Sequence, residues 1–176
     1  MPLPGLIYRC APLDDVAVLE RLPAEYAQLL AQRNGFVALG GALHVRGACI
    51  APAWHSLSAA MEGTGALHRL FREVAPTDIP FGQTALGDQL LLRDDQLFQW
   101  TPGGPDARPL GCTVTQYLQR VLEDPAALLP LEQLAAFRQS GGHLAAGELL
   151  VPHGSGWRAQ PMLERLRDLA GRAEPA

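Results

Sequence analysis

The segment from residue 89 to residue 101 constrains the fold more than any other part of the chain. Apolar residues dominate Gln89 to Arg93 and again Leu97 to Thr101, and two aspartates, Asp94 and Asp95, lie between the two runs. Two strand-like runs that are separated by turn-forming residues are typical of an antiparallel β-hairpin. The chain is therefore expected to build a sheet around its middle.

A second pair of strands is predicted upstream, in the sequence FVALGGALHVRGACI at residues 36–50. Its short apolar runs and the Gly-Gly break favour a hairpin. In the second strand, Leu43 and Val45 would share one face, while His44 and Arg46 would share the other. We expect His44 to be exposed on that face.

Helical spacing of apolar residues surrounds these strands. The predicted helices lie in segments 11–35 (two helices, separated at Pro23), 56–76, 112–125, 129–142 and 161–172, with one further short strand at 148–152 and a loop at 101–111. Thr113 and Gln116 have the spacing of a capping box. Strands in the middle with helices around them predict an α+β domain with a central, mostly antiparallel sheet flanked by helices.

Size and composition place the chain among folded single domains. It has 176 residues, 48% of them hydrophobic and 18% charged, and a net charge of −4. The mild acidity argues against a general nucleic-acid binder and favours a basic partner. The N-terminus does not have the pattern of a signal peptide, and no stretch approaches the roughly 18 apolar residues of a membrane span. We expect a cytoplasmic protein with three reduced cysteines.

Several short patterns suggest catalysis or ligand binding, but each has a simpler interpretation. Gly82 and Gly87 are spaced like the glycines of a phosphate-binding loop, yet Asp88 and Gln89 occupy the positions of its lysine and hydroxyl residue. A turn that enters the sheet is the better interpretation. The sequence HGSGW at 153–157 lacks the first part of a hydrolase elbow.

Two sets of histidines and cysteines were considered as sites. His44, Cys49 and His55 are residue types that suit zinc, but their spacing matches no common structural site and a fourth ligand is missing. Cys112 and His143 could form a thiol nucleophile and its base, although nothing local supports the pair. We therefore predict no catalytic residues, no metal and no cofactor.

Residues for partner binding are predicted instead. Asp88 lies at one end of a predicted strand and Asp94 and Asp95 at the other, where they form either turns or an acidic edge that contacts a protein. Trp54 and Trp157 lie near loops or strand ends, where a tryptophan can supply a large contact area.

The order of motifs is more informative than any one of them. A helix with the pattern LP-x-x-Y-x-x-L-L ends in NG, a central strand pair follows, and IPFG then precedes GD and an apolar strand. The matching residues are Leu22, Pro23, Tyr26, Leu29, Leu30, Asn34, Gly35, Ile79, Pro80, Phe81, Gly82, Gly87 and Asp88. This order resembles the SUKH superfamily of bacterial immunity proteins over residues 13–124. The segments QTAL and RDDQ depart from the family's usual pattern.

The resemblance implies a single domain over residues 1–176, with residues 125–176 as a helical C-terminal extension packed on it. It also implies a non-catalytic protein that binds and neutralises a cognate secreted toxin, such as a type VI secretion effector, encoded nearby. We expect a monomer or weak homodimer that binds neither nucleic acid nor membrane. The alternatives are a regulatory or scaffold module and a small hydrolase that uses Cys112, His143 or the aspartates.

Overall fold

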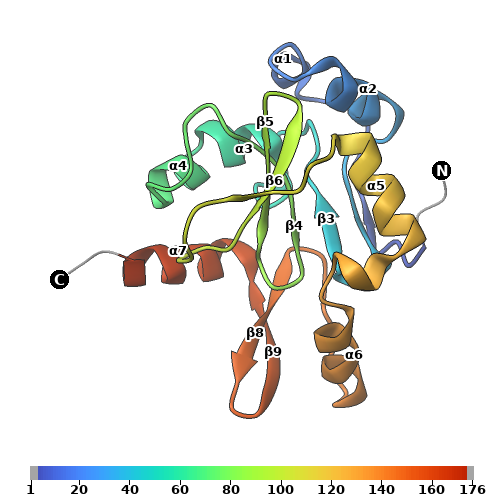
Figure 1. The fold of residues 1–176 in the computed structure, drawn as a ribbon, viewed down its shortest axis with the longest axis vertical. Coiled ribbons are helices and arrows are strands. Elements are labelled where there is room, and N and C mark those ends of the chain that lie inside the picture. Colours follow the sequence, from blue (N-terminus) through green and yellow to red (C-terminus); the bar gives the residue numbers. More distant parts are fainter. Residues whose placement is uncertain (1–3, 174–176) are drawn as a thin grey trace.

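The computed structural model describes residues 4–173 and has an α+β fold, as the sequence predicts. Seven antiparallel strands follow one another across the main sheet in chain order (Figure 1). They are β1 (Tyr8–Arg9), β2 (Phe36–Ala38), β3 (Leu43–Val45), β4 (Ile79–Thr84), β5 (Gln89–Arg93), β6 (Gln96–Trp100) and β7 (Arg108–Pro109). Each strand therefore pairs with its neighbours in the sequence, which is the topology of a meander.

Helices lie on both sides of this sheet. They are α1 (Val16–Leu19), α2 (Ala24–Gln32), α3 (Leu57–Glu62), α4 (Leu67–Leu70), α5 (Val114–Glu123), α6 (Leu131–Gln139) and α7 (Met162–Ala173), with short 3-10 turns η1 (Leu39–Gly41) and η2 (Pro125–Ala127). The predicted capping box of α5 is confirmed, because the Thr113 side chain accepts from the Gln116 amide and the Gln116 side chain accepts from the Thr113 amide.

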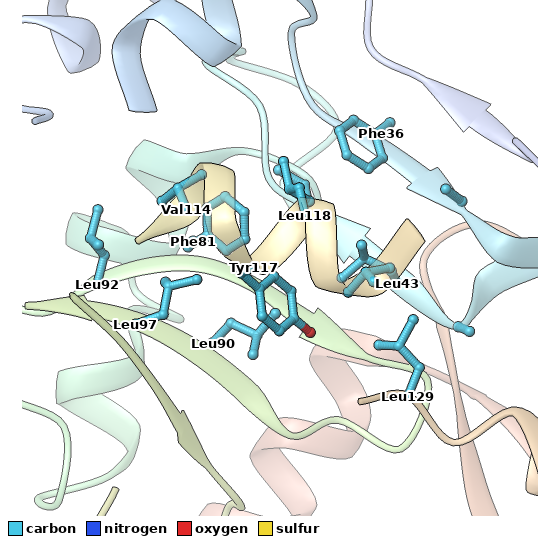
Figure 2. Packing of buried hydrophobic residues seen from close by; sticks show 14 of the residues in the cluster. Phe36, Leu43, Phe81, Leu90, Leu92, Leu97, Val114, Tyr117, Leu118 and Leu129 are labelled. Carbon is cyan, nitrogen blue, oxygen red and sulfur yellow. The ribbon is translucent and has the colours of Figure 1, made fainter. Parts of the chain in front are cut away.

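Alternate residues of β5 enter two hydrophobic clusters on opposite faces of the sheet. Leu90 and Leu92 belong to the larger cluster, together with the buried face of α5; Figure 2 shows Tyr117 and Leu118 of that helix over the strands. Leu91 belongs to the smaller cluster, together with residues of α4 and α7. The sheet is thus buried on both faces, which explains why β5 is an uninterrupted apolar run.

The C-terminal region differs from the predicted helical extension. Besides α6 and α7 it contains a second sheet, the hairpin of β8 (Glu148–His153) and β9 (Gly156–Pro161), which projects beyond the main sheet (Figure 1). Only a short strand at 148–152 was expected, because β9 has the sequence GWRAQP and few apolar residues. The HGSGW segment forms the turn and the first residues of β9.

Two further expectations are wrong. The interpretation of the segment between Gly82 and Gly87 as a turn that enters the sheet is wrong for its first part, because residues 82–84 belong to the central strand β4, which pairs with β3 and β5; only residues 85–88 form the connection into β5. A register shift between Pro80 and Gly82 lets this strand contain a proline. The helix expected through Val74 is only the single turn α4, which ends at Leu70.

Within the described residues, no helix has the length and apolarity required to cross a membrane.

Candidate functional site

The turn between β5 and β6 presents two exposed carboxylates. Arg93 pairs with Gln96, so Asp94 and Asp95 are the two residues of the loop, and their φ angles are 46° and 62°. Two positive φ angles in a two-residue hairpin are the geometry of a type I′ turn, which Asn and Gly adopt with the least strain. The predicted turn is confirmed, and it holds two negative charges at one end of the hairpin.

Asp88 lies at the other end of β5 and is engaged in internal contacts. Its carboxylate accepts hydrogen bonds from Thr101 Oγ1 at 2.6 Å, Thr84 Oγ1 at 3.2 Å and Gln99 Nε2 at 3.3 Å. Asp88 therefore connects the β4–β5 turn to β6. Because β5 separates it from Asp94 and Asp95, the three aspartates do not form one patch.

The two tryptophans predicted to bind a partner are both half-buried. The Trp54 ring lies 4.9 Å from Tyr8 and 5.4 Å from His44, measured between ring centroids. Trp157, on β9, packs against the larger hydrophobic cluster. The five predicted partner-binding residues thus lie on four segments of the chain, and only Asp94 and Asp95 share one, the β5–β6 turn.

A buried arginine, Arg46, donates hydrogen bonds to strands β4 and β5. Arg46 is 2% exposed, and its guanidinium donates to four uncharged acceptors: the Pro80 and Gly82 carbonyls and the Gln83 and Gln89 side-chain oxygens, at 2.9 to 3.3 Å. Burial lowers the pKa of Arg46 to about 10. The guanidinium thus supplies hydrogen-bond donors to the carbonyls of β4 on both sides of its register shift.

Beside Arg46, two histidines share one hydrogen bond. His44 Nε2 and His55 Nδ1 are 2.8 Å apart, and both rings are buried, contrary to the expectation of an exposed His44. Burial and, to a lesser extent, the charge of Arg46 together lower the pKa of His55 to about 4, although the Asn34 backbone acts in the opposite direction. Burial likewise holds the pKa of His44 well below its usual value. Burial thus favours the uncharged form of both rings.

Two cysteines converge on His55. The sulfur atoms of Cys10 and Cys49 and one ring nitrogen of His55 all lie within 4.8 Å of one another, and all three residues are buried. Asn34 holds the two cysteine-bearing segments together, since its Nδ2 donates to the Ala11 and Ala48 carbonyls and to Cys10 Sγ. These three residues are the set in the described chain that could hold a metal ion.

The sequence could not identify this set fully. Cys49 and His55 were considered, but Cys10 was not, because it lies 39 positions before Cys49 in the chain. The antiparallel pairing of β1 with β2 and of β2 with β3 brings the two cysteines together. Two glycines are the trace that this site leaves in the sequence, because Gly35 and Gly47 both lie beside the His55 ring. A Cβ atom at either position would lie 2.8 Å or less from His55 Nε2.

The other sequence-based candidates are separated or structural. Cys112 is buried, and the charged group that affects its pKa is Arg120, whereas His143 is exposed between α6 and β8. Gly82 is required for strand packing, since a Cβ there would lie 2.3 Å from the His44 carbonyl oxygen. Cys112 and His143 lie in different environments, the first in the core and the second at the surface.

A small cavity of about 120 Å³ opens near the Arg46 network. Its walls include Trp54 and residues of α3, α4 and α7, among them Met162, Leu166 and Arg167. Its lining is largely apolar, so it suits a small apolar group better than a polar substrate.

Comparison of the chain with protein-family models, with curated proteins and with solved structures found no match.

Proposed function

We propose that this chain is a non-catalytic immunity protein, which binds and neutralises a cognate secreted toxin in the cytoplasm. The β5–β6 turn is the proposed contact. The observation that carries the proposal is the pair of exposed aspartates at this turn, both in the left-handed backbone region. Asn, Asp and Gly all tolerate the left-handed region, so the turn itself does not require carboxylates, and two adjacent ones concentrate negative charge at an exposed end of the hairpin.

The residues that carry the SUKH resemblance support the proposal because they pack against one another. Tyr26 of α2 lies 5.0 Å from the Phe81 ring, and its hydroxyl donates to the Arg46 and Phe81 carbonyls at 3.1 and 3.3 Å. The Asn34 side chain accepts a hydrogen bond from the amide of Ala48, two residues after Arg46. A motif whose members share one core is more informative than the same residues scattered over the fold.

The chemistry of the turn indicates the kind of surface that it would meet. Carboxylates at a strand end attract lysine and arginine side chains, and such charges set the association rate and the choice of partner more than the total affinity. A stable complex would bury about 800 Å² per partner, which is far more than one turn supplies. Neighbouring surfaces would complete the interface.

The test uses the toxin encoded next to this gene. Cells that express the toxin should survive when this protein is co-expressed, and the two proteins should co-purify. Survival without co-purification would indicate regulation rather than direct binding, and would contradict the proposal. Failure of both measurements would also overturn it.

A matched pair of double variants tests the turn itself. Asp94→Asn with Asp95→Asn removes two charges and keeps residues that suit positive φ. Glu123→Gln with Glu132→Gln removes two charges from exposed positions on α5 and α6. We expect the first variant to bind the toxin at least tenfold more weakly by calorimetry, which corresponds to about 1.4 kcal/mol. Equal affinities for both variants would exclude the turn as the contact.

A further inference from the structure

The buried set of Cys10, Cys49 and His55 has the composition of a metal site. Thiolate and imidazole are the ligands that Zn²⁺ prefers, with bonds of roughly 2.3 Å to sulfur and 2.0–2.1 Å to nitrogen. Ligand atoms around a tetrahedral zinc are therefore roughly 3.5–3.8 Å apart. The three ligand atoms here lie within 4.8 Å of one another, so a small inward movement of the side chains would reach this geometry.

The nitrogen that is available on His55 is the one a metal would need. Nδ1 is engaged with His44, whereas Nε2 is buried, lies beside the Asn34–Gly35 backbone and makes no hydrogen bond of ordinary geometry. If Nδ1 donates its proton to His44 Nε2, Nε2 carries a free lone pair. A second group that fixes the tautomer in this way is a regular feature of histidine ligands in metal sites.

The surroundings also favour a cation. The backbone amide of Ile50, next to Cys49, donates to Asp14 at 2.9 Å, which places that carboxylate close to the cysteines. A divalent cation bound between the sulfurs would displace their protons, hold both as thiolates and be attracted by the nearby Asp14 carboxylate. The Asn34 amide, 3.5 Å from Cys10 Sγ, would donate to one of them.

We propose that Cys10, Cys49 and His55 bind one Zn²⁺ ion, with His44 as the residue that orients His55. The fourth coordination position is left for water or another ligand. Cys10 also lines a surface depression of about 610 Å³ with Leu30 and Asn34, which gives solvent a route to that position. This inference does not depend on the proposed binding of a toxin.

Zinc would have a clear structural effect at this position. Strand β1 contains two residues at the edge of the sheet, and Cys10 follows it directly. Cys49 and His55 lie in the connection between β3 and α3. A shared ion would therefore fasten the edge strand to this connection and raise the thermal stability of the protein.

The primary test measures metal uptake by the reduced full-length protein. After incubation with one equivalent of zinc and desalting, we expect about one zinc per chain by mass spectrometry. Cobalt substituted for zinc should give the visible bands of a tetrahedral site and thiolate-to-cobalt charge-transfer absorption. Failure of the reduced protein to retain zinc above the buffer control would overturn the proposal.

Variants assign the ligands. Cys10→Ser and His55→Gln should each lose the retained zinc, whereas Cys112→Ser should keep it, because Cys112 is also buried but belongs to the larger hydrophobic cluster and not to the ligand set. His44→Gln should bind zinc roughly 10- to 100-fold more weakly, measured against a coloured chelator. Equal zinc retention by Cys10→Ser and the unaltered protein would contradict the assignment.

The cobalt spectrum keeps the test decisive if a ligand variant does not fold. The chain has three cysteines, so charge-transfer absorption that persists in Cys112→Ser must come from Cys10 and Cys49. Loss of the absorption in Cys112→Ser would place the metal elsewhere. A Cys10–Cys49 disulfide in the isolated protein, combined with no metal uptake after reduction, would also overturn the proposal.

Discussion

Titratable residues have opposite environments in the buried cluster around Arg46 and in the exposed β5–β6 turn. Arg46, His44 and His55 are each at most 3% exposed, and burial lowers their pKa values, which favours their uncharged forms. Asp94 and Asp95 are exposed and lie in a strained backbone region. The comparison teaches that the first group is held by partners inside the fold, while the second is exposed to solvent at the turn that we propose as the contact.

The strongest way to break the comparison is to remove the buried guanidinium. Arg46→Met keeps much of the side-chain volume but leaves the Pro80 and Gly82 carbonyls and the Gln89 side-chain oxygen without this donor. We expect a loss of about 3–5 kcal/mol in the free energy of unfolding, measured in urea. Arg108→Met, at an exposed position, should change it by about 0.5 kcal/mol or less. Similar losses in both variants would show that burial does not distinguish the two arginines.

A second test compares a closely packed glycine with one that has open space for a Cβ atom. Gly82→Ala would place a Cβ 2.3 Å from the His44 carbonyl oxygen and force β3 and β4 apart. This should cost about 2–3 kcal/mol of unfolding free energy. Gly65→Ala meets no atom within 4 Å and should be neutral or slightly stabilising. A tolerated Gly82→Ala would mean that the strand pair can shift without loss.

The turn should respond in the opposite direction. Asp95→Gly places a residue without a Cβ at a φ of 62°, so we expect a gain of about 0.5–1 kcal/mol in unfolding free energy. The same variant should bind the toxin more weakly, since one charge is lost. A gain in stability together with weaker binding would indicate that the aspartate serves the partner, whereas a loss of stability would identify a structural role.

Glu25 is half-buried, and so lies between the buried Arg46 cluster and the exposed turn in its environment. Its replacement should have the smallest effect on the free energy of unfolding. Its carboxylate accepts from Thr113 Oγ1 at 3.0 Å and from the Thr115 amide at 2.9 Å, at the start of α5. Burial acts to raise its pKa, but these hydrogen bonds lower it overall. Glu25→Gln should therefore cost about 0.5–1 kcal/mol at pH 7.

The pH dependence of this variant has a defined sign. Because the folded pKa of Glu25 lies below its ordinary value of 4.5, its contribution is present above that value and is lost as the pH falls through the folded pKa. The difference between Glu25→Gln and the unaltered protein should vanish in urea unfolding at low pH. A difference that is independent of pH would mean that the charge is not responsible. Glu123→Gln, at the exposed C-terminal end of α5, is the control.

The sequence predicted best the parts of the fold whose signals are local. The β5–β6 hairpin, with its Asp-Asp turn, needs only adjacent residues, and the capping box of α5 needs only Thr113 and Gln116. Both are confirmed. Strand β4 was missed because Pro80 and Gly82 ordinarily interrupt strands, and only the register shift and the close approach of β3 explain them.

The candidate sites were harder to predict, because they depend on distant contacts. His44 was expected to be exposed on the assumption that one sheet face meets solvent, but helices cover both faces. Cys10 has no local motif that connects it with Cys49 and His55. Asp88 was grouped with Asp94 and Asp95 because all three are carboxylates at the ends of one predicted strand, but its contacts with Thr84 and Thr101 give it a structural role.

Amide hydrogen exchange, measured for the free protein and for its complex with the neighbouring-gene toxin, tests the central claim most directly. We expect exchange to slow at residues 93–97 when the toxin binds, and to stay unchanged at residues 43–46, which are already buried in the free protein. Slower exchange confined to the β8–β9 hairpin or to the cavity between α3, α4 and α7, with no change at 93–97, would contradict the account.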